Sequence, residues 1–245
     1  MPRVSPLVAA VILGLIVSAC GGQASAQEIR SAVARAGVDS AAVQDARAVL
    51  DAFSVDLYKV LARGAENLIL SPYSVGVALA MTRAGAVGET AGQMDKVLHA
   101  ALSKDINVGF NALDQSVAKR PGKYTVGDRT LELELATANR LWGQKDFSFE
   151  AAFLDQLARS YGAGIQVVDY RNAHEAARDA INDWVAARTH DRIKDLIPQG
   201  VIDQATRLVL TNAIYLKAAW LTRFRDAVPG IFHRADGSDV QAKLM

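Results

Sequence analysis

Residues 207–217 place the strongest constraint on the fold, because this stretch is almost continuously apolar and rich in β-branched side chains. Such a run is typical of a β-strand that is covered on both faces. A strand of this kind needs other strands beside it and further elements packed on its two faces. We therefore expect residues 207–217 to form an interior strand of a central sheet.

Segments with helical and with strand-like patterns alternate along the rest of the chain. Apolar side chains recur at helical spacing, which predicts helices over residues 42–62, 106–117, 149–161 and 173–189. Ser71-Pro72 is a typical helix start, and Thr90 with Gln93 has the spacing of a capping box. Short strands are predicted over residues 67–70, 131–142 and 165–170, with another after a turn at 235–238. This order favours the α+β class.

Two glycine- or proline-containing segments are interpreted as connections. Residues 119–129 are polar and include Pro121, which predicts a surface loop without a domain boundary. Gly162 and Gly164 lack the third glycine of a dinucleotide-binding loop and follow a predicted helix. This pair is therefore expected to form the turn into the next strand.

The overall composition excludes several classes of protein. The chain has 245 residues, 51% of them hydrophobic and 22% charged, so it can bury a sizeable core. Its net charge is +1 without long runs of one sign, which argues against nucleic acid as a partner. Cys20 is the single cysteine, so no intramolecular disulfide can form. The four histidines show no metal-binding or catalytic motif, and we expect no enzyme activity, metal or cofactor.

The first residues have the pattern of an export signal. Arg3 precedes an apolar run over residues 7–19, which is short for a spanning helix. Residues 17–20 resemble a bacterial lipobox, in which Cys20 would be acylated and would attach the protein to a membrane. Cleavage after Ala26 is the alternative, because small residues also precede that position. We expect a leader over 1–20, a flexible tether over 21–41 and one domain over 42–245.

Five motifs in sequence order together resemble the serpin family. They are NLILSPYSVGVALAM at 67–81, GETAGQMDKVL at 88–98, ANRLW at 138–142, INDWV with IKDLIP at 181–198, and RLVLTNAIYLKAAW at 207–220. Each motif is weak alone, but five in the same order are specific. The resemblance implies an α+β fold in which helices pack on a large mixed central sheet. It extends from about residue 44 to the end of the chain.

The resemblance also implies a mechanism and a set of site residues. In inhibitory serpins a protease cleaves an exposed loop, and the loop then inserts as a new strand into the main sheet. The matched positions that would control sheet opening are Ser71, Ser74 and Asn212, and Trp220 matches an aromatic at the top of the gap. Each has a simpler explanation: Ser71 as a helix N-cap, Asn212 as a satisfied buried amide, and Trp220 as a core aromatic.

The family's reactive loop, its scissile bond and its final strands have no counterpart in this sequence, so we expect a partial serpin domain. The function that the resemblance implies is inhibition of a serine-type or cysteine-type protease by the full-length protein. A noninhibitory binding or chaperone protein of the envelope is one alternative, and the inactive product of a truncated gene is another. We also expect the chain alone to be aggregated or molten, because the apolar strand 207–217 would have an uncovered edge.

Overall fold

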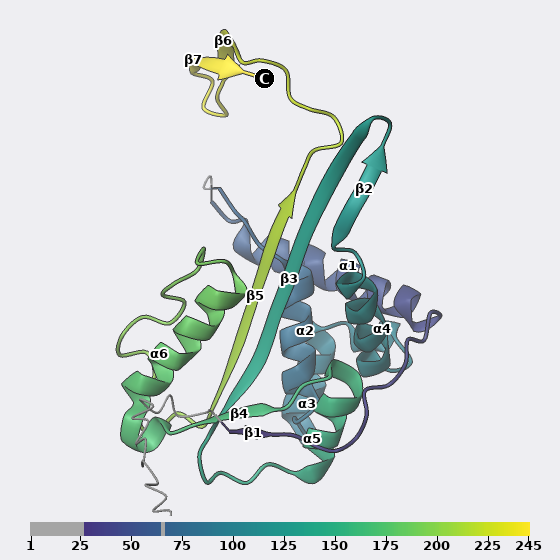
Figure 1. Ribbon diagram of the computed structural model, residues 1–245, viewed down its shortest axis with the longest axis vertical. Helices are drawn as coiled ribbons and strands as arrows, with labels where there is room; N and C mark the ends of the chain where they lie inside the picture. The colour runs from purple at the N-terminus through teal and green to yellow at the C-terminus, as the bar shows by residue number, and fades with distance from the viewer. Residues whose placement is uncertain (1–26, 65–66) are drawn as a thin grey trace, which may run out of the picture.

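The computed structural model describes residues 27–64 and 67–245 (Figure 1). A group of helices covers one face of a five-stranded sheet, and a single long helix lies on the other face. A separate two-stranded hairpin stands at the far end of the molecule, beyond the long strands of the sheet. The α+β class with a mixed central sheet is therefore confirmed.

The helices on the first face follow each other closely along the chain. They are α1 (Ala42–Leu61), α2 (Pro72–Arg83), α3 (Gly88–Val97), η1 (Ala100–Leu102), α4 (Ile106–Ala118), α5 (Ala151–Gln156) and the π-helical turn η2 (Leu157–Tyr161). Side chains that are common at helix N-termini cap two of them. Ser71 caps α2 by accepting from the Ser74 backbone amide, and Asp105 caps α4. The capping box of Thr90 and Gln93 is not formed, because α3 already begins at Gly88 and Thr90 lies inside the helix, where Gln93 donates to Glu89 at 3.0 Å instead.

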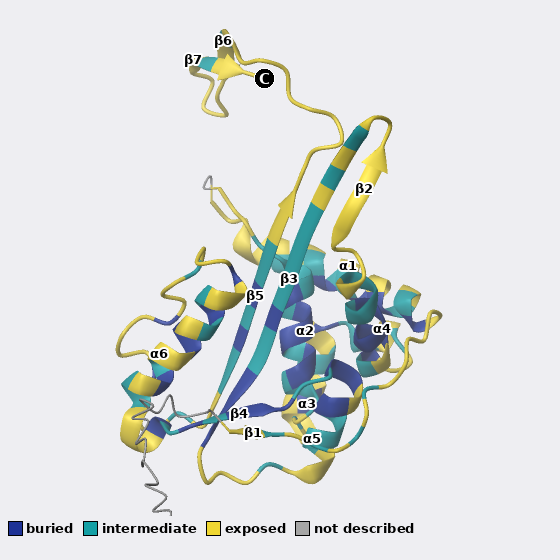
Figure 2. Ribbon diagram, in the orientation of Figure 1, coloured by how far each residue is buried: buried dark blue, intermediate teal, exposed yellow. Residues whose placement is uncertain are grey.

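The main core lies between these helices and the sheet. α1, α2 and α4 contribute most of its large side chains, and strands β3 and β4 contribute Leu141 and Ile165. Figure 2 shows the buried residues gathering in α2 and α4 and along the part of β3 beside α2. The helix predicted from Ser71-Pro72 is buried on most sides, because its Val77, Ala80 and Met81 belong to this core and Gly76 is buried beside them.

The sheet is built around one long central strand. β3 (Arg129–Gln144) pairs in parallel with β4 (Ile165–Val168) and antiparallel with both β2 (Gly122–Val126) and β5 (Leu208–Ala218). β1 (Glu28–Ile29) adds a short antiparallel strand on the outer edge of β4. The strand predicted over 131–142 is thus the middle of β3, and the predicted loop 119–129 is instead largely β2 and its turn. The turn forms at Gly127, whose φ of 63° suits a hairpin.

β5 has the uncovered edge that was expected for residues 207–217 in this chain, although its apolar pattern is that of an interior strand. One edge pairs with β3 along the whole strand, but the other edge has no partner among residues 27–64 and 67–245. Thr211 and Ala213 in its middle are buried, whereas Leu208 is 38% and Leu216 is 64% exposed. The apolar pattern of β5 therefore exceeds the cover that the described residues provide.

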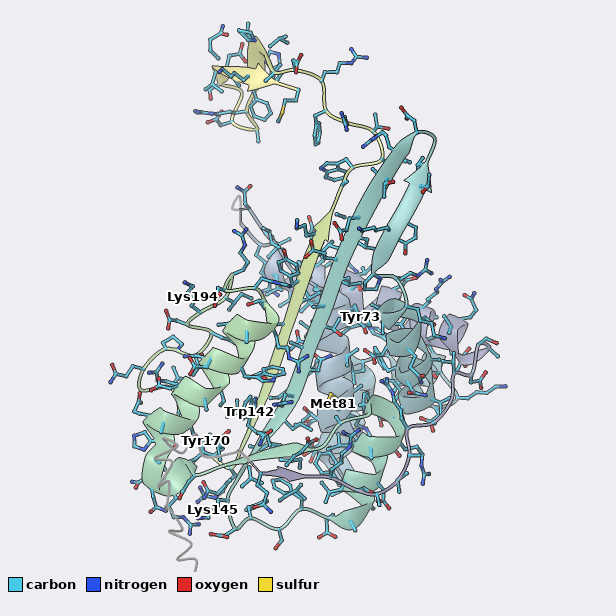
Figure 3. The ribbon with its side chains drawn as sticks, viewed as in Figure 1. Tyr73, Met81, Trp142, Lys145, Tyr170 and Lys194 are labelled. Atoms are coloured by element: carbon cyan, nitrogen blue, oxygen red, sulfur yellow. The ribbon has the colours of Figure 1, made fainter. Side chains whose placement is uncertain are left out.

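Helix α6 (Tyr170–Arg188) packs on the opposite face of β3 and β5. The apolar face that predicts this helix consists of Ala177, Ile181, Trp184 and Val185; Trp184 is half-buried and the other three are buried, so this prediction is confirmed. Figure 3 shows Trp142 and Tyr170 on the side of the sheet toward α6, whereas Met81 lies on the side of α2.

Three further predictions differ from the structure or lie outside it. Residues 67–70 form no strand, because no described strand lies beside them, and Ile69 is 98% exposed. Residues 27–37 pack against the body, so the expected flexible tether is wrong for that segment. The predicted leader and Cys20 lie outside the described residues. Within the part described, none of the helices combines the length and apolar character needed to cross a membrane.

The C-terminal hairpin follows the predicted pattern. β6 (Val228–His233) pairs antiparallel with β7 (Asp239–Leu244), and the connecting turn contains the predicted residues 235–238. Gly237 adopts the positive φ of 81° that this turn requires.

Candidate functional site

Three of the four residues that the resemblance selected meet at one place, where the N-terminus of α2 touches β5. The side-chain amide of Asn212 on β5 donates a hydrogen bond of 2.7 Å to the backbone carbonyl of Ser74 on α2. The same amide also bonds to the side-chain oxygen of Asn139, which lies directly opposite on β3. One asparagine therefore connects two strands and a helix at the edge of the sheet.

The two serines of this cluster have different roles. Ser71 accepts a hydrogen bond from the Ser74 backbone amide at 3.4 Å, so its explanation as a helix N-cap is correct. The Ser74 side chain is only 2% exposed, and its hydroxyl has no partner among the described residues. A buried hydroxyl without a partner is unfavourable, so a rearrangement that supplied a partner would stabilise the rearranged state.

Asn139 is a member of this cluster that sequence reasoning did not select. It lies in the ANRLW motif, but only the register of β3 against β5 places its side chain next to Asn212. Alternation along a strand gives the face on which a residue lies, and it does not give the register between strands. The sequence therefore offered the motif that contains Asn139, but it did not show that Asn139 pairs with Asn212.

Trp220 does not belong to this cluster. It follows the end of β5, is 68% exposed and packs edge-on against Phe224 with 5.7 Å between ring centroids. Arg129 holds this segment, because its guanidinium donates to the carbonyls of Trp220 (3.3 Å) and Leu221 (2.9 Å). The explanation of Trp220 as a core aromatic is wrong for the described structure, in which it borders an open pocket beside the β2–β3 turn.

The cluster itself carries no charged side chain, and the nearest ionic network lies one residue away on α2. The Tyr73 hydroxyl donates to Asp114 at 2.9 Å, and burial together with the Asp114 carboxylate raises the pKa of Tyr73 above its ordinary value. The residues that the structure describes include no group of three His, Cys, Asp or Glu side chains placed to hold a metal ion. What the cluster can do chemically is exchange neutral hydrogen bonds as strands and helix move.

Comparison with known proteins decides the family. The sequence model of Serpin (serine protease inhibitor) matches residues 48–245, which is most of the chain. The chain belongs to the serpin family. The resemblance to serpins that the five motifs indicate is therefore confirmed.

Individual serpins show how much of the fold is present. The leukocyte elastase inhibitor of Sus scrofa is 40% identical over 174 residues, which are 70% of this chain and 44% of that protein. Cleaved Serpin 42Da matches with a TM-score of 0.67 and 31% identity, covering 82% of this chain and 53% of that one. Ovalbumin from emu (Dromaius novaehollandiae) matches with a TM-score of 0.71 over 81% and 54%, but at 24% identity it shows the fold alone. The chain spans about half the length of these serpins.

Proposed function

We propose that the full-length protein inhibits serine-type endopeptidases by inserting its own cleaved loop as a new strand beside β5. One observation carries the proposal: the serpin family model matches residues 48–245, and within them the link between Asn212 of β5 and Ser74 of α2 ties a long strand of the main sheet to the helix beneath it. When a sheet opens, the strand edge that is freed presents backbone N–H and C=O groups that bind an added strand. The 40% identity to an elastase inhibitor supports the same conclusion.

The chemistry of this mechanism is supplied by the protease. Its serine hydroxyl attacks the scissile carbonyl of the loop, an ester forms to the N-terminal part of the loop, and the new amine departs. Insertion of the acylated loop beside β5 then carries the protease away before water hydrolyses the ester. Asn212 contributes by giving up its bond to the Ser74 carbonyl as the edge rearranges, while the Ser74 hydroxyl can gain a partner.

Formation of a covalent complex tests this proposal. The full-length gene product is incubated with a panel of serine and cysteine endopeptidases, and the products are separated under denaturing conditions. We expect an ester-linked complex with one or more serine enzymes, and none with the same enzyme whose nucleophile has been blocked. Cleavage of the loop without any complex would identify a noninhibitory serpin, and a complex formed only with cysteine enzymes would contradict the assignment to serine proteases.

We further propose that the protein is exported and acylated at Cys20, as residues 17–20 suggest. Mass spectrometry of the mature protein from a bacterial host tests this directly. The expected N-terminus is a lipid-modified Cys20, and a Cys20→Ser variant should leave the membrane fraction. An unmodified N-terminus at Gln27 would contradict the anchor and support cleavage after Ala26.

A further inference from the structure

Residues 27–37 run along the outside of the body and are attached at both ends (Figure 1). At one end β1 pairs with β4, and the Gln27 carbonyl accepts from the Val167 amide at 2.7 Å. At the other end the Ala36 amide donates to the carbonyl of Arg159 in η2 at 2.8 Å. We call this segment the brace, because it spans from the edge of the sheet to the helical layer.

Gly162 and Gly164 make room for the brace. A Cβ atom on Gly164 would lie 2.5 Å from the Glu28 carboxylate and 2.7 Å from the Ile29 carbonyl, both of which belong to the brace. Gly162 has a φ of 60°, and a Cβ there would lie 2.9 Å from the Arg35 side chain. This glycine pair therefore does more than turn the chain into β4, since it lets a second backbone pass close by.

Arg35 connects the brace to α4. Its guanidinium donates to Asp114 at 2.6 Å and to the side-chain oxygen of Asn111 at 3.0 Å. The Asn111 side-chain amide in turn donates to the backbone carbonyls of Ala36 (3.2 Å) and Gly37 (3.1 Å). Asn111 of α4 therefore both accepts from the brace and donates to it. Charge-assisted hydrogen bonds that are partly shielded from water are stronger than those between exposed groups.

Asp114 links Arg35 to Tyr73, which lies next to the candidate site. One carboxylate oxygen accepts from Arg35, and the other accepts from the Tyr73 hydroxyl at 2.9 Å. Tyr73 lies between Ser71 and Ser74 in the first turn of α2, and the Ser74 carbonyl holds Asn212 of β5. A continuous series of bonds therefore runs from the brace, through Arg35, Asp114 and Tyr73, to the edge of the sheet.

We propose that the brace holds the N-terminus of α2 against β5 through Arg35 and Asp114, and so slows the opening of the sheet at the Asn212 link. This role rests on the proposed function, because it concerns the same opening that would admit the loop. It adds Arg35, Asp114 and Tyr73 as positioning residues that lie outside the edge itself. Displacement of the brace then becomes a way to make insertion faster.

Hydrogen exchange on the full-length protein, without any protease, tests the coupling. Arg35→Ala breaks the series at the brace, and Tyr73→Phe breaks it at α2 while leaving the brace in place. We expect each variant to exchange the backbone amides around Ser74 and Asn212 about tenfold faster than the parent protein. The double variant should exchange no faster than the single ones, because both changes interrupt one series of contacts.

Two glycine-to-alanine substitutions, one beside the brace and one away from it, supply a matched comparison. Gly164→Ala should push the brace off its path and reproduce the faster exchange at Ser74 and Asn212. Gly92→Ala, on α3, has open space around its Cβ and should leave that exchange unchanged. The amides of α6 serve as an internal reference within every variant.

The outcomes separate the brace from the proposed function. Faster exchange confined to the brace and β4 would overturn the inference, because the brace would then only cover the edge of β4. An equal increase in α6 would also overturn it, since that pattern reports general destabilisation. If the expected exchange is seen but no protease complex forms, the proposed function fails and the brace stands.

Discussion

Ser71 and Ser74 lie three positions apart on α2, yet their hydroxyl groups are in opposite hydrogen-bonding states. The Ser71 hydroxyl caps the helix, so Ser71→Ala should lower the free energy of unfolding by about 1 kcal/mol. The Ser74 hydroxyl is buried without a described partner, so Ser74→Ala should leave that free energy unchanged or raise it by up to about 1 kcal/mol. Urea unfolding of the full-length protein measures both. A larger loss for Ser74→Ala than for Ser71→Ala would show that the hydroxyl is bonded.

Asn212 combines two hydrogen bonds at the edge of the sheet, to Ser74 and to Asn139. Asn212→Ala should lower the free energy of unfolding by about 2 kcal/mol, because it leaves two acceptors without this donor, the carbonyl of the buried Ser74 and the side-chain oxygen of Asn139. The matched control is Asn182→Ala on α6, where a buried asparagine bonds twice to the Ile197 backbone. Both variants should lose similar stability in urea, but only Asn212→Ala should accelerate hydrogen exchange at the start of α2. The same acceleration in both variants would contradict a special role for Asn212.

At the scale of elements, α6 is attached to the sheet by a cluster of one arginine and two tryptophans that all contact one another. Arg140 of β3 lies 5.6 Å from the Trp142 ring and 4.6 Å from the Trp184 ring of α6, and the two rings pack edge-on at 5.7 Å. Burial lowers the pKa of Arg140, as expected for a cation that is partly removed from water. Trp142 also donates to the Thr211 hydroxyl at 2.9 Å, so this cluster joins β3, β5 and α6.

Removing the Arg140 side chain should loosen α6. Arg140→Ala should lower the free energy of unfolding by about 2 kcal/mol and shift the tryptophan fluorescence to longer wavelength, because Trp142 and Trp184 would gain contact with water. Arg188→Ala is the control, since Arg188 approaches Trp184 at 5.6 Å from the exposed side of α6. It should cost about 0.5 kcal/mol, as exposed cation–π pairs do. Equal losses for the two variants would mean that burial of Arg140 contributes nothing.

At the scale of the whole molecule, apolar surface remains exposed along one side and one end. Leu216, Trp220 and Phe224 are each at least 60% exposed, and they continue from the unpaired edge of β5. Exposed edges with apolar side chains favour pairing between chains. The 245-residue chain on its own should therefore associate as its concentration rises, and Leu216→Lys should reduce this association in size-exclusion chromatography. A monomer with a sharp, reversible two-state unfolding transition would contradict this prediction.

Much of the local structure follows from the sequence alone, because it depends on neighbours within a few residues. The start of α2 at Ser71-Pro72, the buried stripe of α6 and the turn before β7 all reflect caps, periodicity and turn residues. The serpin family also follows from the sequence, since five motifs occur in the family's order. Ser71, Ser74 and Asn212 could be selected on that resemblance before any geometry was known.

Only the tertiary structure decides which of these residues meet. The register of β3 against β5 brings Asn139 to Asn212, and it leaves Trp220 exposed far from both. The brace was missed because residues 27–37 carry no helical or alternating pattern, and their bonds go to residues more than seventy positions away. Contacts between residues so far apart in the sequence depend on how separate elements pack. The local pattern of apolar and polar residues indicates only which face of each element is buried.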